Sequence, residues 1–184
     1  MARSYFPGAN WEPFVYQGNT YNLSHLNEYE FTVEDTTGAT RRIAVTFADH
    51  CFTESAKLGE DPSLAYPSGE RNLRSFSFQR YYLSLGLTGH IEQAASGKVW
   101  TVDGGNFAAL PLLDQSGRQV LYGIIFSLER VKNLLIHLHM RIKSAYPIDN
   151  DIITFGSVRF RHLVALEMKG KNPGRITGQR RKAP

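Results

Sequence analysis

Ile136-His-Leu-His-Met-Arg-Ile-Lys143 is the stretch that decides the fold, and Ser144-Ala-Tyr146 continues it. Its apolar residues alternate with basic ones, which is the two-residue period of a β-strand. The basic residues are His137, His139, Arg141 and Lys143. One face of this strand therefore belongs to a core, and the other carries four basic groups with no acid among them. Such a face is either solvated, as sheet surfaces often are, or it binds something anionic.

The segments around this strand predict a sheet that is mainly antiparallel. Further strands and hairpins are predicted at residues 14–21, 29–47, 98–110 and 119–129. The Asp103-Gly104 and Gly18-Asn19 pairs are turn signals for two of these hairpins. Residues 54–72 are polar and contain two prolines and two glycines, which is typical of a long surface loop.

A helical period replaces the alternation at about residues 71–95, through Phe78, Tyr81, Tyr82 and Leu85. Gly86 and Gly89 follow, and each glycine costs about 1 kcal/mol relative to alanine inside a helix, so the helix is expected to end or bend there. The pattern at residues 155–168 fits both a strand and a helix. The expected fold class is therefore α+β, mainly antiparallel β-sheet with one principal helix near residues 71–95.

The chain has 184 residues, of which 42% are hydrophobic, and this suits one domain with a packed core. We expect a single α+β domain over residues 1–168. Residues 169–184 contain six Lys or Arg and no acid, which predicts a flexible basic tail. No apolar run is long enough to span a bilayer or to serve as a signal peptide. A single cysteine, Cys51, favours a cytoplasmic location without disulfides.

Charge is distributed unevenly along the chain. Residues 1–70 hold four basic and ten acidic residues, for −6, whereas the rest hold 17 and seven, for +10, and the sum is the net +4. A basic half predicts a polyanionic partner for that part of the chain. The alternative is that the acidic N-terminal half contacts a protein partner or the basic half of another copy.

The row of basic residues at positions 137, 139, 141 and 143 is the first candidate site. Residues two apart on a strand lie about 6.6 Å apart on one face, and this spacing is comparable with the repeat of an extended phosphodiester backbone. Arg and Lys neutralise phosphate, and a histidine near its ordinary pKa can move a proton. No acidic third ligand accompanies the two histidines, so no metal is expected.

Two further clusters are weaker candidates. Asp49-His50-Cys51 ends a predicted strand, but adjacent residues of a strand face opposite ways, which favours a structural role for Cys51. Basic residues after 155 are predicted to extend the nucleic-acid-binding surface, and they are Arg159, Arg161, Arg175, Arg180, Arg181 and Lys182. The sequence has no P-loop, dinucleotide fingerprint, HExxH or CxxC motif, so no cofactor is expected.

The order of elements over residues 71–146 resembles the C-terminal part of RelE/ParE-type toxins, which are small bacterial endoribonucleases. That order is a helix, a hairpin and two long strands, the last of which ends in Arg141-Ile-Lys143-Ser-Ala-Tyr146. The resemblance implies metal-free RNA cleavage in which Arg141, Lys143 and Tyr146 bind phosphate and promote proton transfer, assisted by His137 or His139. The chain departs from that family in its acidic N-terminal half and in the residues after Tyr146.

The leading hypothesis is an RNA-directed cytoplasmic protein, with a metal-independent endoribonuclease of toxin type as its most specific form. The first alternative is a nucleic-acid-binding module without enzymatic activity. The second is a protein-interaction or assembly component that uses its acidic and basic halves, including a homo-oligomer.

Overall fold

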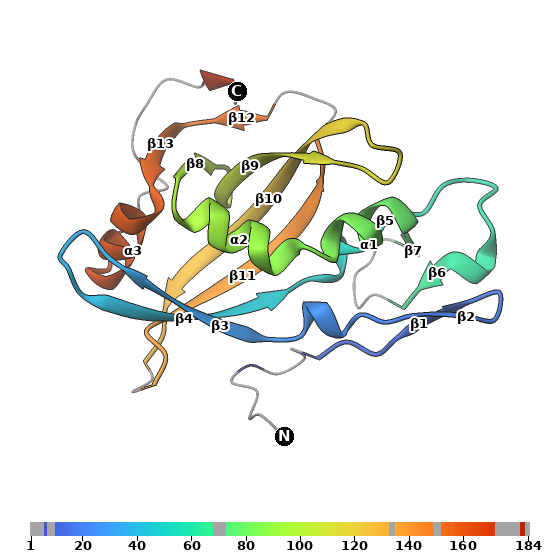
Figure 1. Ribbon diagram of the computed structural model, residues 1–184, viewed down its shortest axis with the longest axis horizontal. Helices are drawn as coiled ribbons and strands as arrows, with labels where there is room; N and C mark the ends of the chain where they lie inside the picture. The colour runs from blue at the N-terminus through green and yellow to red at the C-terminus, as the bar shows by residue number, and fades with distance from the viewer. Residues whose placement is uncertain are drawn as a thin grey trace.

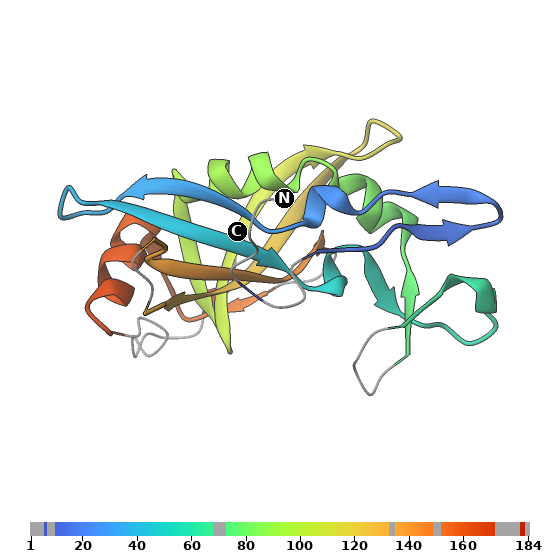
Figure 2. The same ribbon diagram turned by 90° about the horizontal axis from the view of Figure 1, so that it is seen from below.

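The computed structural model describes Phe6, residues 10–67, 73–132, 135–148 and 152–171, and the backbone of residues 181–182. Its centre is a twisted mixed sheet, flanked by helices and extended at one end by small β-structures (Figures 1 and 2). The seven strands of this sheet are, in spatial order, β13 (Gly156–Arg159), β8 (Lys98–Val102), β9 (Gly105–Leu113), β10 (Gln119–Arg130), β11 (Leu138–Pro147), β4 (Thr40–Phe47) and β3 (Tyr29–Glu34).

Strand β11 is the strand predicted from the alternation at residues 136–146, and it joins two antiparallel parts of the sheet. It pairs antiparallel with β10 on one side, and on the other it pairs parallel with β4, with Leu138 beside Ile43 and Ile142 beside Phe47. The alternation of the sequence is retained because Leu138, Met140 and Ile142 are buried. The α+β class is therefore confirmed, while the β4–β11 pair makes the sheet mixed.

A β-bulge interrupts β11 at Lys143. Ile125 of β10 pairs with Ser144 and Phe126 pairs with Ile142, so Lys143 has no partner across the ladder. The next buried residue after Ile142 is consequently Ala145, three positions on. A bulge bends its strand locally and turns the extra side chain away from the regular row.

The helix predicted at residues 71–95 is two helices, α1 (Phe78–Ser84) and α2 (Leu87–Ala95). They are separated at Leu85 and Gly86, and Gly86 is the residue before the first turn of α2. The expected interruption at the glycine is thus present, whereas Arg74–Phe76 form a strand, β7, instead of the beginning of the helix.

Residues 155–168 form both a strand and a helix, the two structures that their sequence pattern fits. Strand β13 ends at Arg159, and helix α3 (Phe160–Met168) begins at the next residue. Phe160, Leu163 and Val164 of α3 are fully buried, and the Phe160 ring contacts Phe126 of β10. The change of period within a short segment explains why neither period dominated the sequence.

Three small sheets complete the described structure. They are β1 (Phe14–Tyr16) with β2 (Asn19–Tyr21); β5 (Thr53–Ser55), β7 and β6 (Ala65–Tyr66); and β12 (Ile153–Thr154) with β14 (Arg181–Lys182). Single helical turns lie at η1 (Ser24–Leu26), η2 (Asp49–Cys51) and η3 (Pro62–Leu64). The polar segment predicted as a loop therefore contains η3 and β6, and two residues of the predicted tail form a strand.

The turn residues act largely as their types predict. Gly104, between β8 and β9, has φ +72°, a conformation that glycine adopts without a Cβ penalty. The first hairpin turns at Gln17 and Gly18, both with positive φ, so Asn19 already belongs to β2. Type I′ hairpin turns require positive φ at both central positions.

The main core lies between the sheet and the helices. Helices α1 and α2 cross one face of the sheet, and α3 packs beside them (Figure 1). Tyr122, Ile124 and Phe126 of β10 meet Leu87 and Ile91 of α2 in one buried cluster. No helix among the described residues has the length and apolarity of a membrane span.

Two glycine substitutions should move stability in opposite directions. A Cβ on Gly105 would lie 2.7 Å from the carbonyl oxygen of Phe126, which is backbone on the neighbouring strand. We expect Gly105→Ala to lower the free energy of unfolding by about 1–3 kcal/mol. Gly89→Ala, in α2 with open space around it, should raise it by about 1 kcal/mol. Urea denaturation followed by circular dichroism measures both, and equal effects would contradict the packing described.

Candidate functional site

The predicted basic row lies on the face of the sheet opposite the helices, here called the outer face and defined by Arg42, Thr46, Ser127, Glu129, His139 and Arg141. His139 is half-buried and Arg141 is exposed, between buried neighbours. Across the ladders, His139 pairs with Glu129 of β10, and Arg141 lies beside Ser127 and Thr46. The row has no acid along its own strand, but the neighbouring strand supplies one.

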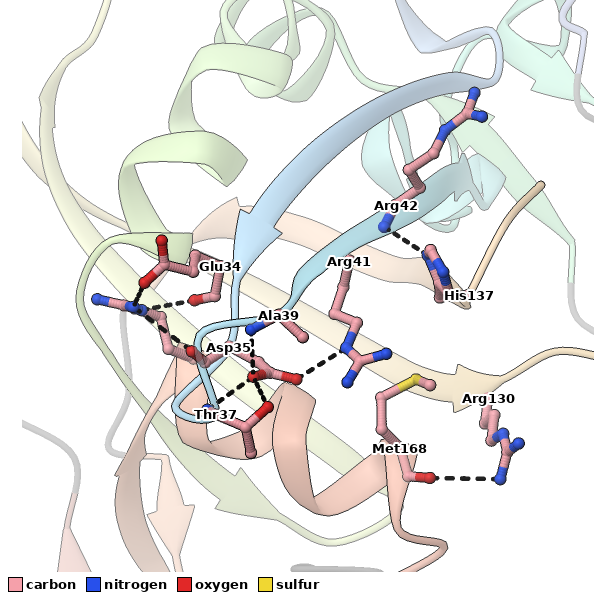
Figure 3. Close-up of polar contacts among 10 residues, drawn as sticks. Glu34, Asp35, Thr37, Ala39, Arg41, Arg42, Arg130, His137 and Met168 are labelled. Atoms are coloured by element: carbon pink, nitrogen blue, oxygen red, sulfur yellow. Dashed lines mark hydrogen bonds and ion pairs between the residues drawn. The ribbon is translucent and has the colours of Figure 1, made fainter. Parts of the chain in front are cut away.

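His137 connects the beginning of β11 to β4. Its backbone N–H donates to the carbonyl oxygen of Arg42 at 3.0 Å, and its Nδ1 accepts the backbone N–H of Arg42 at 2.9 Å (Figure 3). A ring nitrogen that accepts a hydrogen bond from a backbone N–H carries no proton of its own. The His137 side chain therefore extends the parallel ladder by one hydrogen bond.

His139 forms the centre of the outer face. Its Nε2 lies 2.8 Å from the hydroxyl of Thr46, and its ring stacks on Phe6 with centroids 3.7 Å apart and planes at 12°. Burial lowers the pKa of His139, opposed by the carboxylates of Glu129 and Glu28. At neutral pH the ring is therefore uncharged, with an aromatic face already used for stacking.

Arg141 and Lys143 differ in their availability. The guanidinium of Arg141 makes no hydrogen bond or ion pair with any described residue. Lys143 donates from Nζ to the carbonyl oxygen of Gly104 at 2.6 Å, because the bulge turns it toward the β8–β9 turn. Arg141 is thus the free cation of the row within the described part of the chain.

Tyr146 lies at the other end of β11, seven residues and about 23 Å along the strand from His139 at about 3.3 Å per residue. The guanidinium of Arg80, from α1, lies over its ring at 4.9 Å and also donates to the carbonyl oxygen of His50 at 2.9 Å. The five residues predicted to act together are consequently not brought into one site. The structure places Tyr146 in the junction of α1 with η2.

The residues predicted to extend the basic surface do not lie beside Arg141 where they are described. Arg159 lies in β13, on the far edge of the sheet from β3. Arg161 donates from Nε and Nη2 to the backbone and carboxylate of Glu34, each at 2.6 Å, and so links α3 to the β3–β4 turn. Arg181 and Lys182 form β14. Arg175 and Arg180 lie outside the described residues.

The β3–β4 turn is held by a carboxylate network (Figure 3). Asp35 accepts from the hydroxyl and N–H of Thr37, from the N–H of Ala39, and from Nε of Arg41 at 2.8 Å. These donors hold the pKa of the Asp35 carboxyl well below its ordinary value although burial opposes them. The network is structural, since it is directed inward at its own turn.

Asp49-His50-Cys51 forms η2, after β4. Cys51 is fully buried, and burial raises its pKa to about 12, so its thiol is not a nucleophile at neutral pH. The buried residue that the sequence did not single out is Arg74, whose Nε lies 3.9 Å from Asp49 and donates to Thr53. A lone arginine in a short strand has no sequence signal for burial.

Both histidines of the basic row already have polar partners in this arrangement. The imidazole Nδ1 of His137 is bound to backbone and the Nε2 of His139 contacts Thr46. The outer face therefore offers a free guanidinium beside a stacked aromatic ring, not two unoccupied imidazoles. Among the described residues, no three His, Cys, Asp or Glu side chains gather closely enough to hold a metal ion.

Comparison with known proteins identifies a family. The family model described as the YjaZ family matches residues 13–166, which include all seven strands of the central sheet, both α1 and α2, and all of α3 but its last two residues. No curated protein and no solved structure matches the chain.

The half-buried histidines should make stability pH-dependent. Burial lowers the pKa of His139, and likewise those of His25 and His90. As pH falls through the ordinary value near 6.5, the unfolded chain binds protons before the folded chain does, so stability present above that pH is lost below it. We expect the free energy of unfolding to decrease between pH 7.5 and 5, and less steeply in His139→Phe.

Urea denaturation at several pH values measures this slope, with His50→Phe as the control for a histidine outside the outer face. The slope, rather than the stability at one pH, is compared, because the substitution also removes the contact with Thr46. An unchanged slope in His139→Phe would contradict the assigned burial.

Proposed function

The chain belongs to the YjaZ family, and we propose that it binds single-stranded RNA on the outer face of its sheet. The observation that carries this proposal is the parallel stack of Phe6 on His139, two residues from the free guanidinium of Arg141. The family name specifies neither a reaction nor a ligand, so the proposal depends on the chemistry of this face.

Stacking and phosphate contact are the two interactions that proteins use to bind single strands without reading sequence. The His139 ring has the flat face that a base requires. Arg141 lies on the same face of β11 about 6.6 Å further on, and it can donate two hydrogen bonds to one phosphate. Lys143 does not continue this row, because the bulge turns its side chain toward the carbonyl oxygen of Gly104.

Phe6 occupies the position in which a base would stack. Aromatic pairs contribute about 0.5–1.5 kcal/mol beyond the area they bury, whereas stacking of a base on an aromatic side chain contributes about 1–3 kcal/mol. A base that is also held by its phosphate therefore competes effectively with Phe6. Binding would displace the Phe6 ring and leave the His139 ring in place.

The carboxylates near His139 determine where the phosphate of the bound RNA lies. Glu129 is opposite His139, and the Glu28 carboxylate also acts on its pKa, so a phosphate is disfavoured at that end. The uncharged base belongs over His139 and the phosphate at Arg141, away from both carboxylates. An RNA ligand also fits the cytoplasmic location that the single cysteine favours.

The endoribonuclease activity implied by the toxin resemblance remains a prediction. A general base must be unprotonated, and the lowered pKa of His139 provides that form at neutral pH. Its Nδ1 is the nitrogen that remains once Nε2 contacts Thr46. Stacking requires only an aromatic ring at position 139, while cleavage requires the imidazole, so the two roles can be separated.

Arg141→Ala should weaken RNA binding and reduce its salt dependence. Each phosphate contact on a single strand contributes about 0.7 to the slope of log affinity against log salt, and we expect that loss. Fluorescence anisotropy with a labelled oligouridylate between 50 and 200 mM salt measures both quantities. Arg118→Ala is the matched control, because Arg118 is exposed and ion-paired to Asp114 on a distant hairpin. Equal losses in both variants would show general charge attraction and exclude this site.

Substitutions of the stacked pair should act in opposite directions. Phe6→Ala removes the competing ring and should tighten binding. His139→Ala removes the stacking surface and should cost about 1–3 kcal/mol of binding free energy, while His139→Phe should retain most of the affinity. The same anisotropy assay compares the three proteins. Equal affinity of His139→Ala and the parent protein would contradict stacking at this position.

Cleavage is tested on the same proteins with labelled RNA in EDTA. If the chain is a metal-independent nuclease, the parent protein shortens the RNA and His139→Phe binds it without cleaving it. Intact RNA at high protein concentration, together with binding that depends on Arg141, would identify a binding module without this activity.

A further inference from the structure

Strand β3 is the edge of the central sheet, and a groove runs beside it. In the described part of the chain, β3 pairs with β4 alone, so its other side has no strand partner. The groove has a volume of 620 Å³ and lies between β3, the second half of α2 and the beginning of α3. Its lining includes Phe31, Val33, Glu92, Ala95, Ser96 and Arg161.

The floor of the groove is apolar. Phe31 and Val33 point toward the helices and pack against the main core, and Ala95 of α2 is buried beside them. The Phe31 ring lies 6.4 Å from the ring of Phe160. An added strand would therefore place every second side chain over a hydrophobic surface that already belongs to the core.

The remaining side chains of β3 make this edge acidic. Glu30, Thr32 and Glu34 alternate with the apolar residues and are exposed. Glu92 on α2 is exposed as well, and it makes no hydrogen bond or ion pair with a described residue. Arg42 and Arg161 each pair with one of the strand carboxylates, which leaves a net negative charge along the groove.

A second copy of the chain does not suit this edge. If two β3 strands paired antiparallel about Thr32, Glu30 of each copy would face Glu34 of the other. Like charges directly opposite each other destabilise a sheet. The acidic edge therefore disfavours self-pairing, as charged edge strands generally do, and favours a basic partner.

We propose that β3 and its groove bind an extended segment of another protein in which apolar and basic residues alternate. The segment adds an eighth strand to the sheet through main-chain hydrogen bonds to β3. Its apolar residues lie over Phe31 and Val33 on the helix side, and its basic residues lie on the other face beside Glu30 and Glu34. The groove lies on the helix side of the sheet and Arg141 on the outer face two strands away, so this interaction does not require RNA binding.

The probe is a labelled, end-capped peptide, Lys-Val-Lys-Val-Lys-Val-Lys, and its binding to the full chain is measured by fluorescence anisotropy. We expect Thr32→Lys and Glu30→Lys each to weaken binding about fivefold, since each places a lysine on the face of β3 where the lysines of the peptide lie. Hydrogen exchange of the amides of residues 29–34 should slow when the peptide is present, because an added strand protects the free side of the edge.

Two controls separate this site from general charge attraction. Glu12→Lys makes the same charge change at an exposed acid outside the groove and should leave peptide affinity unchanged. A peptide of the same composition without alternation, Lys-Lys-Val-Val-Lys-Lys-Val, should bind more weakly. Equal binding of the two peptides, equal losses in Glu12→Lys and Glu30→Lys, or unchanged exchange in β3 would each overturn the proposal.

Light scattering and the RNA assay complete the test. A dimer that Thr32→Lys converts to a monomer would assign the edge to a second copy and overturn the proposal. Circular dichroism spectra and RNA affinity unchanged from the parent protein would show that the two groove variants are folded, and the spectra serve alone if the parent protein binds no RNA.

Discussion

The parallel pairing of β4 with β11 is the contact on which the rest of the structure depends. Without it the central sheet would separate into the β3–β4 hairpin and an antiparallel block of β13, β8, β9, β10 and β11. An isolated two-stranded hairpin is at best marginally stable in water, so the N-terminal hairpin is ordered by this pairing. His137 strengthens the junction because its ring accepts the N–H of Arg42 where the regular ladder begins. A histidine predicted to act on a ligand thus helps to assemble the sheet.

The same pairing creates the candidate site. It brings the Thr46 hydroxyl to the ring of His139, across 93 residues of sequence, and places Arg141 beside β4. The outer face then combines an uncharged aromatic ring, a free guanidinium and the opposing carboxylate of Glu129. For the proposed RNA ligand, this mixture favours separate base and phosphate contacts over diffuse attraction of a polyanion. The carboxylates of Glu30 and Glu34 at the β3 edge of the same sheet favour a basic ligand instead.

Particular residues show how far the sequence could predict these features. The strand at 138–147 and the shared face of His139 and Arg141 followed from alternation, and the break near Gly86 followed from glycine. The bulge at Lys143 did not, because it depends on the register with β10. Grouping Tyr146 with the histidines failed for a geometric reason, since residues far apart on an extended strand do not converge. The stack of Phe6 on His139 had no local signal in either segment.

The sequence by itself determined the local periods, the turn glycines and which strand carries a basic face, because these properties depend on residues close together in the chain. Only the tertiary structure decided which of those basic groups is free. His137 is bound by a strand 95 residues away, Arg161 by the β3–β4 turn, and Lys143 by the Gly104 carbonyl. Charge is a property of the residue, whereas its availability depends on which donors and acceptors folding brings within hydrogen-bonding distance.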